Sequence, residues 1–346
     1  MIKQIKHGLI RALSSNPLAA LGKGLFGHGL PIFMMHRMQM SNESDGGITE
    51  KQLRRCLQYL VDHDYQFIAL VDLALSLKEN RPLPPNGVVF TMDDGFADQA
   101  EIAAPIFLEF NCPVTFFVIT GMLDQKLLPW DVKASYLINA SKNESINLTF
   151  PDKTYHFNIS SSHGRQEARR IIRDALKMMD PAATDAAIEQ ISQATGVAIP
   201  ASPPKEFAPI SWARARELED SGVKFAPHSI SHRMLSKLDK DSAAEEICGS
   251  WKRLTEELSS PSPVFCYPTG RHCDFGPREI DLVKKAGLIG AVSTVPSYVE
   301  TAIDSKNNLY SLPRFPVPNS FADFLQYCSW IGYAKGRIRS FTTYKP

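Results

Sequence analysis

The sequence has almost no net charge, no long apolar run and no paired cysteine motif. Of its 346 residues, 38 are Lys or Arg and 37 are Asp or Glu, which leaves a formal net charge of +1. A chain so close to neutral has no general attraction for nucleic acid or anionic lipid. No apolar stretch approaches the roughly 20 residues that cross a bilayer, which excludes a membrane-spanning helix. With 44% hydrophobic and 22% charged residues, the composition is that of a globular protein.

The cysteines are few and lie apart from one another, mostly within apolar stretches. No CxxC pair occurs, so a zinc ribbon is excluded and a disulfide framework is not expected. Buried free thiols are typical of a protein from a reducing compartment. The six are Cys56, Cys112, Cys248, Cys266, Cys273 and Cys328.

Residues 1–29 contain lysines but lack the apolar core of a secretion signal. Their apolar side chains are spaced as on one side of a short basic amphipathic helix. Two interpretations remain open: a helix packed on the outside of the domain, or peripheral membrane contact through residues 1–25. We therefore expect a cytoplasmic protein, with the inner membrane face as the alternative. The apolar side chains in question are Ile2, Ile5, Leu9, Ile10 and Leu13.

Short apolar segments alternate with amphipathic ones along the chain, which is typical of an α/β fold. The length fits one (β/α)-barrel-type domain, and we place it at residues 30–318, followed by a C-terminal extension at 319–346. The expected strands are residues 31–35, 66–70, 87–92, 114–119, 223–226, 264–266 and 288–292.

Helical signals lie between these strands. Thr49 and Gln52 have the spacing of a capping box that opens a helix towards His63. Pro277 and Gly287 fit the first turn and the end of another helix. Further helices are expected over residues 97–110, 211–220 and 241–258.

Residues 141–205 interrupt this alternation. The pattern there predicts a hairpin (146–150 and 155–159), then two polar helices and a proline-rich segment. Because the alternation resumes unchanged afterwards, we interpret the segment as an insertion in the barrel that shapes substrate access.

Two adjacent carboxylates, Asp93 and Asp94, directly follow the apolar strand that ends at Met92, and Gly95 comes next. Two ionised neighbours repel each other unless they share a cation or a proton. Capping of the following helix by Asp94 or Asp98 explains one carboxylate, but it does not explain the second.

Two histidines, His228 and His232, follow another strand end. On one helical turn, a spacing of four residues places both imidazoles on the same side, close enough to share an ion. A lone histidine is usually a core or surface residue. Together with a carboxylate, however, the pair forms a three-ligand set that leaves positions open for water and substrate, as catalytic metal sites do.

In barrels, residues at the carboxyl ends of strands converge on one face. His36, the Asp93–Asp94 pair, His228 and the Tyr267–Pro268 segment each follow a predicted strand. We therefore expect these residues to converge on one site.

The chain resembles the polysaccharide deacetylase family (carbohydrate esterase family 4, the NodB-homology domain). Thr91-Met92-Asp93-Asp94-Gly95 is similar to the T-F-D-D-G motif, and residues 228–232 match H-[ST]-x-x-H. Residues 265–270 are similar to the family's later proline-containing motif. The resemblance also takes in Trp130-Asp131 and Leu312-Pro313-Arg314, as in members from exopolysaccharide gene clusters. It implies a distorted (β/α)-barrel of about seven strands.

The resemblance also implies roles for individual residues. Asp94, His228 and His232 would hold a divalent metal, and Asp93 would be the general base for water attack. The backbone N–H near Thr269 would stabilise the oxyanion. Zinc suits two histidines and a carboxylate, and cobalt, nickel and iron are alternatives.

The sequence departs from the family in two places. No histidine follows His272, so the usual C-terminal acid is missing. His36 resembles the early histidine of poly-N-acetylglucosamine deacetylases, and we predict it as the acid, with His272 as second choice and a core-lining role for His36 as the alternative. The arginine before the Pro-Tyr motif is also missing. We predict that Arg314 pairs with Asp93 in its place, a structural ion pair being the alternative.

The sequence thus predicts a metal-dependent hydrolase that removes N-acetyl groups from amino sugars of a glycan or its lipid- or nucleotide-linked precursor. Two other function classes stay open. One is a degenerate, glycan-binding family member, and the other is a metal-dependent hydrolase of a different amide or an O-acetyl ester.

Overall fold

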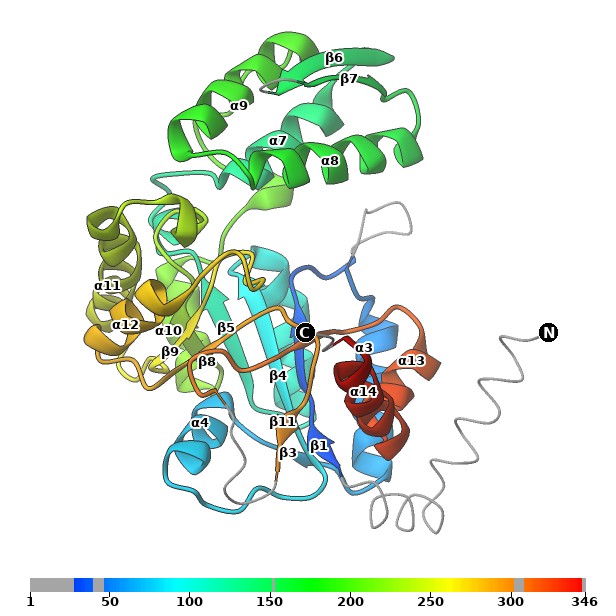
Figure 1. Cartoon of the computed structure of the whole chain (residues 1–346), viewed down its shortest axis with the longest axis vertical. Helices are drawn as coiled ribbons and strands as arrows, with labels where there is room; N and C mark the ends of the chain where they lie inside the picture. The colour runs from blue at the N-terminus through cyan, green and yellow to red at the C-terminus, as the bar shows by residue number, and fades with distance from the viewer. Residues whose placement is uncertain (1–27, 40–46, 151–152, 302–307, 344–346) are drawn as a thin grey trace, which may run out of the picture.

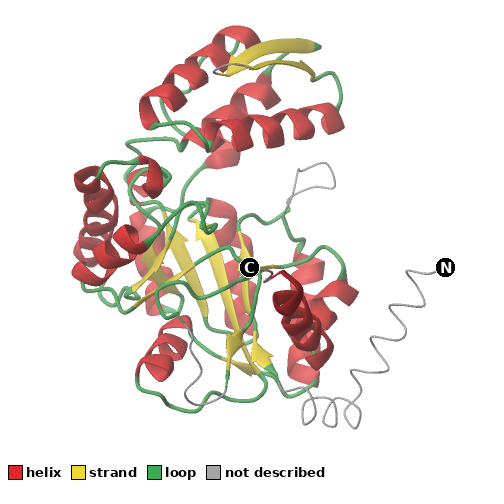
Figure 2. Cartoon of the chain, in the orientation of Figure 1, coloured by secondary structure: helices red, strands yellow, loops and turns green. Residues whose placement is uncertain are grey.

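The computed structural model describes residues 28–39, 47–150, 153–301 and 308–343 of the chain. A mainly parallel sheet with helices packed around it forms the larger part (Figure 1). A smaller lobe of helices and one hairpin stands beside it (Figure 2). The predicted helix within residues 1–25 lies outside the described residues.

The main ladder runs in the order β12–β2–β4–β5–β8, and every neighbouring pair in it is parallel. The short strand β3 pairs with the start of β4. The strands are β2 (Ile32–Met35), β3 (Gln66–Phe67), β4 (Gly87–Asp94), β5 (Val114–Val118), β8 (Lys224–Pro227) and β12 (Phe315–Pro316).

A second parallel pair continues the curve of this sheet. It consists of β9 (Val264–Cys266) and β10 (Gly290–Val292). The amide of Ser262 donates to the carbonyl of Phe225 on the β8 side, and Val292 bridges to Leu312 on the β12 side. The predicted α/β class of distorted-barrel type is therefore confirmed, although the ladders among the described residues do not close into a ring.

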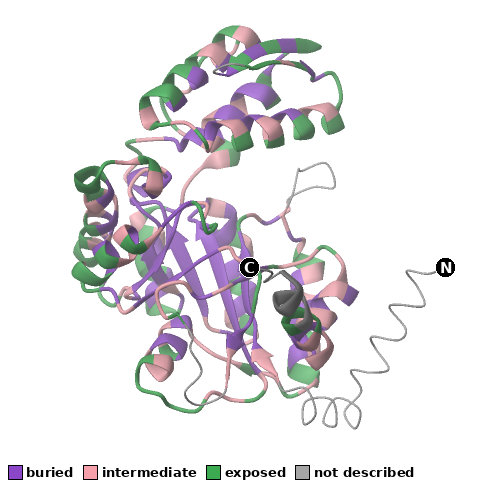
Figure 3. Ribbon diagram, viewed as in Figure 1, coloured by how far each residue is buried: buried purple, intermediate pink, exposed green. Residues whose placement is uncertain are grey.

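Strand β4 shows how the sheet is buried between apolar clusters on its two faces. All eight of its residues are buried, so it is covered on both faces (Figure 3). Phe90 and Met92 pack into the largest apolar cluster, whereas Val89, which points the other way, packs into a different one. This double coverage matches the continuous apolar run in the sequence.

The helices around the sheet follow the sequence signals closely. The Thr49 hydroxyl accepts the Gln52 amide, and the Gln52 side chain accepts the Thr49 amide, which confirms the capping box. Gly287 follows the last of these helices with φ +80°. The helices are α3 (Glu50–Asp62), α4 (Leu70–Lys78), α5 (Ala104–Glu109), α6 (Thr120–Leu123), α10 (Trp212–Asp220), α11 (Lys240–Glu257) and α12 (Pro277–Lys285).

Two predicted elements differ from the structure. The strand expected at residues 66–70 ends at Phe67, and α4 already begins at Leu70. The helix expected at 97–110 opens as a π-helix, Gln99–Ala103, before α5. Pro105 has no N–H to give to the carbonyl four residues before it, and the amide of Ala104 bonds five residues back, to Gln99.

The lobe is built from α7 (Trp130–Ala140), β6 (Ser145–Phe150), β7 (Lys153–Asn158), α8 (Ser162–Leu176) and α9 (Pro181–Thr195). The strands β6 and β7 form the expected hairpin. These elements enclose an apolar cluster of their own, which includes Trp130 and Leu137 of α7. The compact unit therefore starts at Trp130, earlier than the insertion at residues 141–205 that the sequence suggested.

The C-terminal segment packs onto the larger part. Helix α13 (Phe321–Cys328) buries Phe324 and Leu325 in the largest apolar cluster, and the Phe324 ring stacks on Phe33 of β2. Helix α14 (Trp330–Thr343) follows it. A two-stranded antiparallel pair, β1 (Gly29–Leu30) with β11 (Val299–Glu300), lies nearby. No helix in the described part of the chain is long and apolar enough to span a membrane.

Candidate active site

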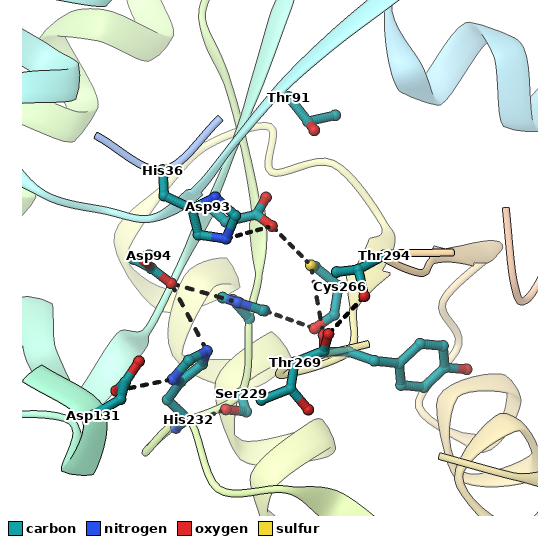
Figure 4. A network of polar contacts seen from close by, with 12 residues as sticks. His36, Thr91, Asp93, Asp94, Asp131, Ser229, His232, Cys266, Thr269 and Thr294 are labelled. Carbon is teal, nitrogen blue, oxygen red and sulfur yellow. Dashed lines mark hydrogen bonds and ion pairs between the residues drawn. The ribbon is translucent and has the colours of Figure 1, made fainter. Parts of the chain in front are cut away.

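The two adjacent carboxylates end β4. Successive strand residues point to opposite faces, yet Asp93 and Asp94 both lie in the same polar network (Figure 4). Asp94 has φ +84°, and Gly95 follows with φ +85°. Such values are costly for a residue with a side chain and cluster at functional sites. The backbone therefore leaves the extended strand conformation at Asp94, the residue that we predicted as a metal ligand.

No hydrogen bond of Asp94 to a helix amide is found within the described ranges, and Asp98, although it precedes the π-helix, makes no side-chain cap.

The structure brings Asp94, His228 and His232 together. One potential ligand atom of each lies within 4.8 Å of the other two. The Nε2 atoms of His228 and His232 are 3.6 Å and 3.8 Å from Oδ1 of Asp94. A tetrahedral ion with bonds of about 2.1 Å holds its ligand atoms about 3.4 Å apart. The two distances to Oδ1 of Asp94 are therefore close to those in a loaded zinc-type site.

The polar bonding of these residues also fits a cation. Oδ1 of Asp94 is buried and has no hydrogen-bond partner in the described structure, which is costly for a carboxylate oxygen. Burial raises the pKa of Asp94, because it penalises the charged form. A cation between the three side chains would give this oxygen a partner. The donor set and its orphaned oxygen thus fit a divalent ion.

The remaining ring nitrogens orient both imidazoles. Nδ1 of His228 lies 2.8 Å from the carbonyl oxygen of Cys266, and Nδ1 of His232 lies 3.3 Å from Oδ1 of Asp131. When the ring is neutral and Nδ1 donates, Nε2 keeps its lone pair for an ion, the arrangement in which outer partners tune metal histidines. Burial and the neighbouring His232 lower the pKa of His228 to about 3, so that imidazole is neutral.

The two histidines are not on a helical turn, contrary to the sequence-based expectation. Residues 228–232 form a loop after β8 in which Ser229 has φ +64° and His232 has φ +60°. The Ser229 hydroxyl accepts the His232 amide at 3.0 Å. The Glu246 carboxylate accepts the amides of Ile230 and Ser231 at 2.8 Å and 2.9 Å, and also the Ser231 hydroxyl. A tight turn held by Glu246 therefore brings the imidazoles together.

Asp93 and Arg314 form a bidentate ion pair. Both N–O distances are 2.7 Å, and the two side chains are 1% and 0% exposed. The same guanidinium donates to Thr91, to the carbonyl of Ser293 and to Sγ of Cys266. Burial would raise the pKa of Asp93, but Arg314 outweighs burial and holds that pKa well below its usual range. Asp93 is therefore ionised.

His36 lies at the open side of this network. Its Nε2 is 3.8 Å from Oδ2 of Asp93, and its side chain is 50% exposed. A side chain with that exposed fraction does not line the core, which was the alternative role for His36. The buried Gln99 side chain donates to the carbonyls of both His36 and Asp93, so the π-helix joins the ends of β2 and β4. His272 is also exposed, in the loop after β9.

Thr269 lies in a turn after β9 with φ +59°. Its hydroxyl donates to Asp274, and its carbonyl accepts the hydroxyl of Thr294. Its amide N–H has no acceptor among the residues that the structure describes. An amide left without an acceptor in this turn fits the predicted oxyanion donor.

Sequence reasoning gave no role to three polar residues of the site. Asp131 was noted only as part of a resemblance, yet it accepts from His232, and the neighbouring Trp130 indole donates to the His232 carbonyl. Glu246 and Gln99 carried no sequence signal, because each acts on backbone groups of segments far away in the chain. Only the tertiary structure shows these contacts.

A parallel α/β fold whose carboxyl edge carries two histidines and two aspartates in this arrangement fits the class of hydrolases. The family model for polysaccharide deacetylases matches residues 80–289, which is more than half of the chain. The chain belongs to the polysaccharide deacetylase family. YxkH of Bacillus subtilis (strain 168), whose name also carries the words polysaccharide deacetylase, is 26% identical over 97 residues. That match spans 28% of this chain and 34% of YxkH.

Solved structures share the fold. The deacetylase PplD of Streptococcus pyogenes, in complex with acetate, superimposes with a TM-score of 0.57 at 18% identity, covering 87% of this chain and 98% of PplD. IcaB from Ammonifex degensii gives 0.55 at 17% identity, over 87% and 97% of the two chains. A de-N-acetylase from Aggregatibacter actinomycetemcomitans gives 0.51 at 13% identity, over 85% and 96%.

Proposed function

We propose that this protein is a metal-dependent N-deacetylase that removes acetyl groups from amino sugars of a glycan or its precursor. The observation that carries the proposal is the buried, unpartnered Oδ1 of Asp94, which lies between two imidazoles beside the ionised Asp93. Membership of the polysaccharide deacetylase family supports it. So does the name of one structural neighbour, a de-N-acetylase.

Asp94, His228 and His232 would hold the ion. When bound, a divalent ion of the zinc type supplies a Lewis acid that polarises the acetamide carbonyl and makes water more acidic. Asp93 then accepts the proton of the attacking water. Because Arg314 lowers the pKa of Asp93, this base is ionised but weak.

The other residues act on the acyl group and the amine. The amide N–H of Thr269 stabilises the negative charge on the carbonyl oxygen as water adds to the carbon. His36 donates a proton to the nitrogen as the C–N bond breaks, so that acetate and a free amino sugar leave. Its exposed ring beside Asp93 suits this role, because the leaving sugar must reach it from solvent.

The test is acetate release from N-acetylated chito-oligosaccharides with zinc, cobalt or nickel added. We expect Asp93→Asn to lose at least 100-fold in kcat, the lower range for removal of a general base, while elemental analysis shows metal content retained. Asp72→Asn, an exposed aspartate on α4, is the matched control and keeps wild-type turnover. Wild-type turnover by Asp93→Asn would remove Asp93 from the mechanism.

A further inference from the structure

Gln99 is a buried polar residue beside the active site that the mechanism above does not use. It is 0% exposed and is the first residue of the π-helix (Gln99–Ala103) that follows β4. Its side-chain nitrogen donates to the carbonyl of His36 at 2.7 Å and also to the carbonyl of Asp93. Both partners are acceptors, so the amide nitrogen must face them. One side chain thus links the backbone of the proposed acid to that of the proposed base.

The other atom of the Gln99 amide is in an unfavourable place. Its Oε1 is buried and has no hydrogen-bond partner in the part of the chain that the structure describes. A buried acceptor without a donor costs free energy, and an apolar side chain of similar length would avoid that cost. What the glutamine adds at this position is therefore its two bonds to the carbonyls. Short π-helices are also frequent at functional sites, which fits a role for Gln99 in the reaction.

Asp98, directly before Gln99, holds the next two residues of the segment that contains His36. Its buried carboxylate accepts the amide of Met38 at 2.5 Å and Nε of Arg37 at 3.0 Å. Three consecutive residues after β2 are therefore each bonded to Asp98 or Gln99. We call Asp98 and Gln99 the π-helix pair.

The proposed base and the proposed acid depend on this pair to different degrees. Asp93 lies within β4, in register with Phe117 of β5, and Arg314 holds its carboxylate through two bonds. His36 lies just beyond the end of β2, and its Nε2 is 3.8 Å from Asp93, which is longer than a hydrogen bond (Figure 4). Its side chain is half exposed, so packing does not enclose the ring. The bonds of the π-helix pair to the backbone are therefore what fixes the position of His36.

We propose that the π-helix pair positions His36 for proton transfer to the leaving nitrogen, with Gln99 as the main positioning residue. This inference rests on the proposed function. By fixing the backbone of His36 against that of Asp93, the pair keeps the acid beside the base at the open side of the site. A misplacement of about 1 Å, caused by a change away from the reacting atoms, can cost about 100-fold in rate. Gln99 is buried and acts through the backbone of His36.

The first experiment measures acetate release from N-acetylated chitotetraose by zinc-loaded Gln99→Met. Methionine is unbranched and fills the space but has no N–H donor. We expect kcat to fall about tenfold or more, part of the roughly 100-fold or more that a general acid contributes, while KM and metal content stay near the wild-type values. Gln166→Met, at an exposed glutamine of α8, is the matched control and keeps the wild-type kcat. An unchanged kcat in Gln99→Met, or loss of its metal, overturns the proposal.

A double-mutant cycle with His36→Ala separates positioning of the acid from general support of the fold. If Gln99 acts through His36, Gln99→Met has no further effect on kcat once the imidazole is gone. Equal losses in the two backgrounds would show that Gln99 supports another part of the site, and the proposal would fail. If Gln99→Met does not fold, Asp98→Asn takes its place, because it weakens the bonds to Arg37 and Met38. The loss that it causes should also vanish in the His36→Ala background, and a loss that persists there contradicts the proposal.

Crystallography separates this proposal from the proposed function. If the wild type releases no acetate from the oligosaccharide, the proposed function fails. The positioning of His36 is then judged from crystal structures of the wild type and of Gln99→Met. A displaced His36 in the variant, with Asp93 still bound to Arg314, supports the role of the π-helix pair, whereas an unmoved His36 overturns it.

Discussion

Arg314 uses all its donors within the core, and its loss should change how Asp93 titrates. With Arg314→Gln, burial remains and the compensating cation is gone, so the pKa of Asp93 rises. Less of the carboxylate is then ionised at a given pH, and the acid limb of kcat/KM moves to higher pH. The measurement is the pH profile of acetate release.

Arg314→Lys serves as the comparison for that profile. It keeps one positive charge but not the two parallel bonds, so its acid limb should lie between those of the wild type and Arg314→Gln. An acid limb that stays in place in both variants would show that Asp93 does not set it.

A second prediction at the residue scale concerns Glu246. It holds the amides of Ile230 and Ser231 between the two histidines. In Glu246→Gln the negative charge is lost, and an NH2 group replaces one of the carboxylate oxygens. This group cannot accept from the backbone N–H groups of the loop, so the hydrogen bonds that hold the loop become weaker. We expect metal affinity to fall about 10–100-fold, the usual effect of removing an outer partner, as measured by competition with a chelator.

Glu245→Gln is the matched control for this change. Glu245 is the exposed neighbour on the same helix and has no ion pair in the described structure. It should retain wild-type affinity. Equal affinity in both variants would mean that the loop keeps its shape without Glu246.

At the scale of elements, the capping box of α3 gives a prediction that concerns stability alone. Thr49→Ala removes the hydroxyl that accepts the Gln52 amide. We expect a loss of about 1 kcal/mol in the free energy of unfolding, measured by urea denaturation. Thr49→Ser keeps the hydroxyl and should keep most of that stability. An unchanged midpoint for Thr49→Ala would show that the helix is fixed by packing instead.

Local sequence signals located the elements that depend on local physics. The continuous apolar run of β4, the capping box of α3 and the Pro277–Gly287 limits of α12 act within a few residues, and all are present in the structure. The strand at 264–266 was also predicted with its observed bounds. Signals of this kind do not depend on distant parts of the chain.

The features that the sequence did not predict correctly depend on tertiary contacts. A spacing of four residues suggested a helical turn for His228 and His232, whereas Glu246, from the next helix, holds a strained loop in its place. The two imidazoles do lie together, as the spacing suggested, but on a loop and not on a helical turn. In the same way, the sequence could suggest that Arg314 faces Asp93, but not that Asp131 would support His232.

At the scale of the whole molecule, the candidate metal site draws on residues from both parts of the structure. Asp94 ends β4, the histidines follow β8, and Asp131 begins the lobe, which has an apolar cluster of its own. An ion bound there would cross-link the larger part to the lobe through His232. Metal binding should therefore stabilise the folded chain as a whole.

Removal of the metal tests that coupling. An ion present at 100 times its Kd adds about 2.7 kcal/mol to the free energy of unfolding, since it binds only the folded state. We expect chelation with EDTA to lower the melting temperature and re-addition of zinc to restore it, as followed by calorimetry. Asp94→Asn, which lacks a full ligand, should melt at the same temperature with and without EDTA. If the wild type also melts at one temperature under both conditions, the three side chains do not hold an ion that matters to the fold.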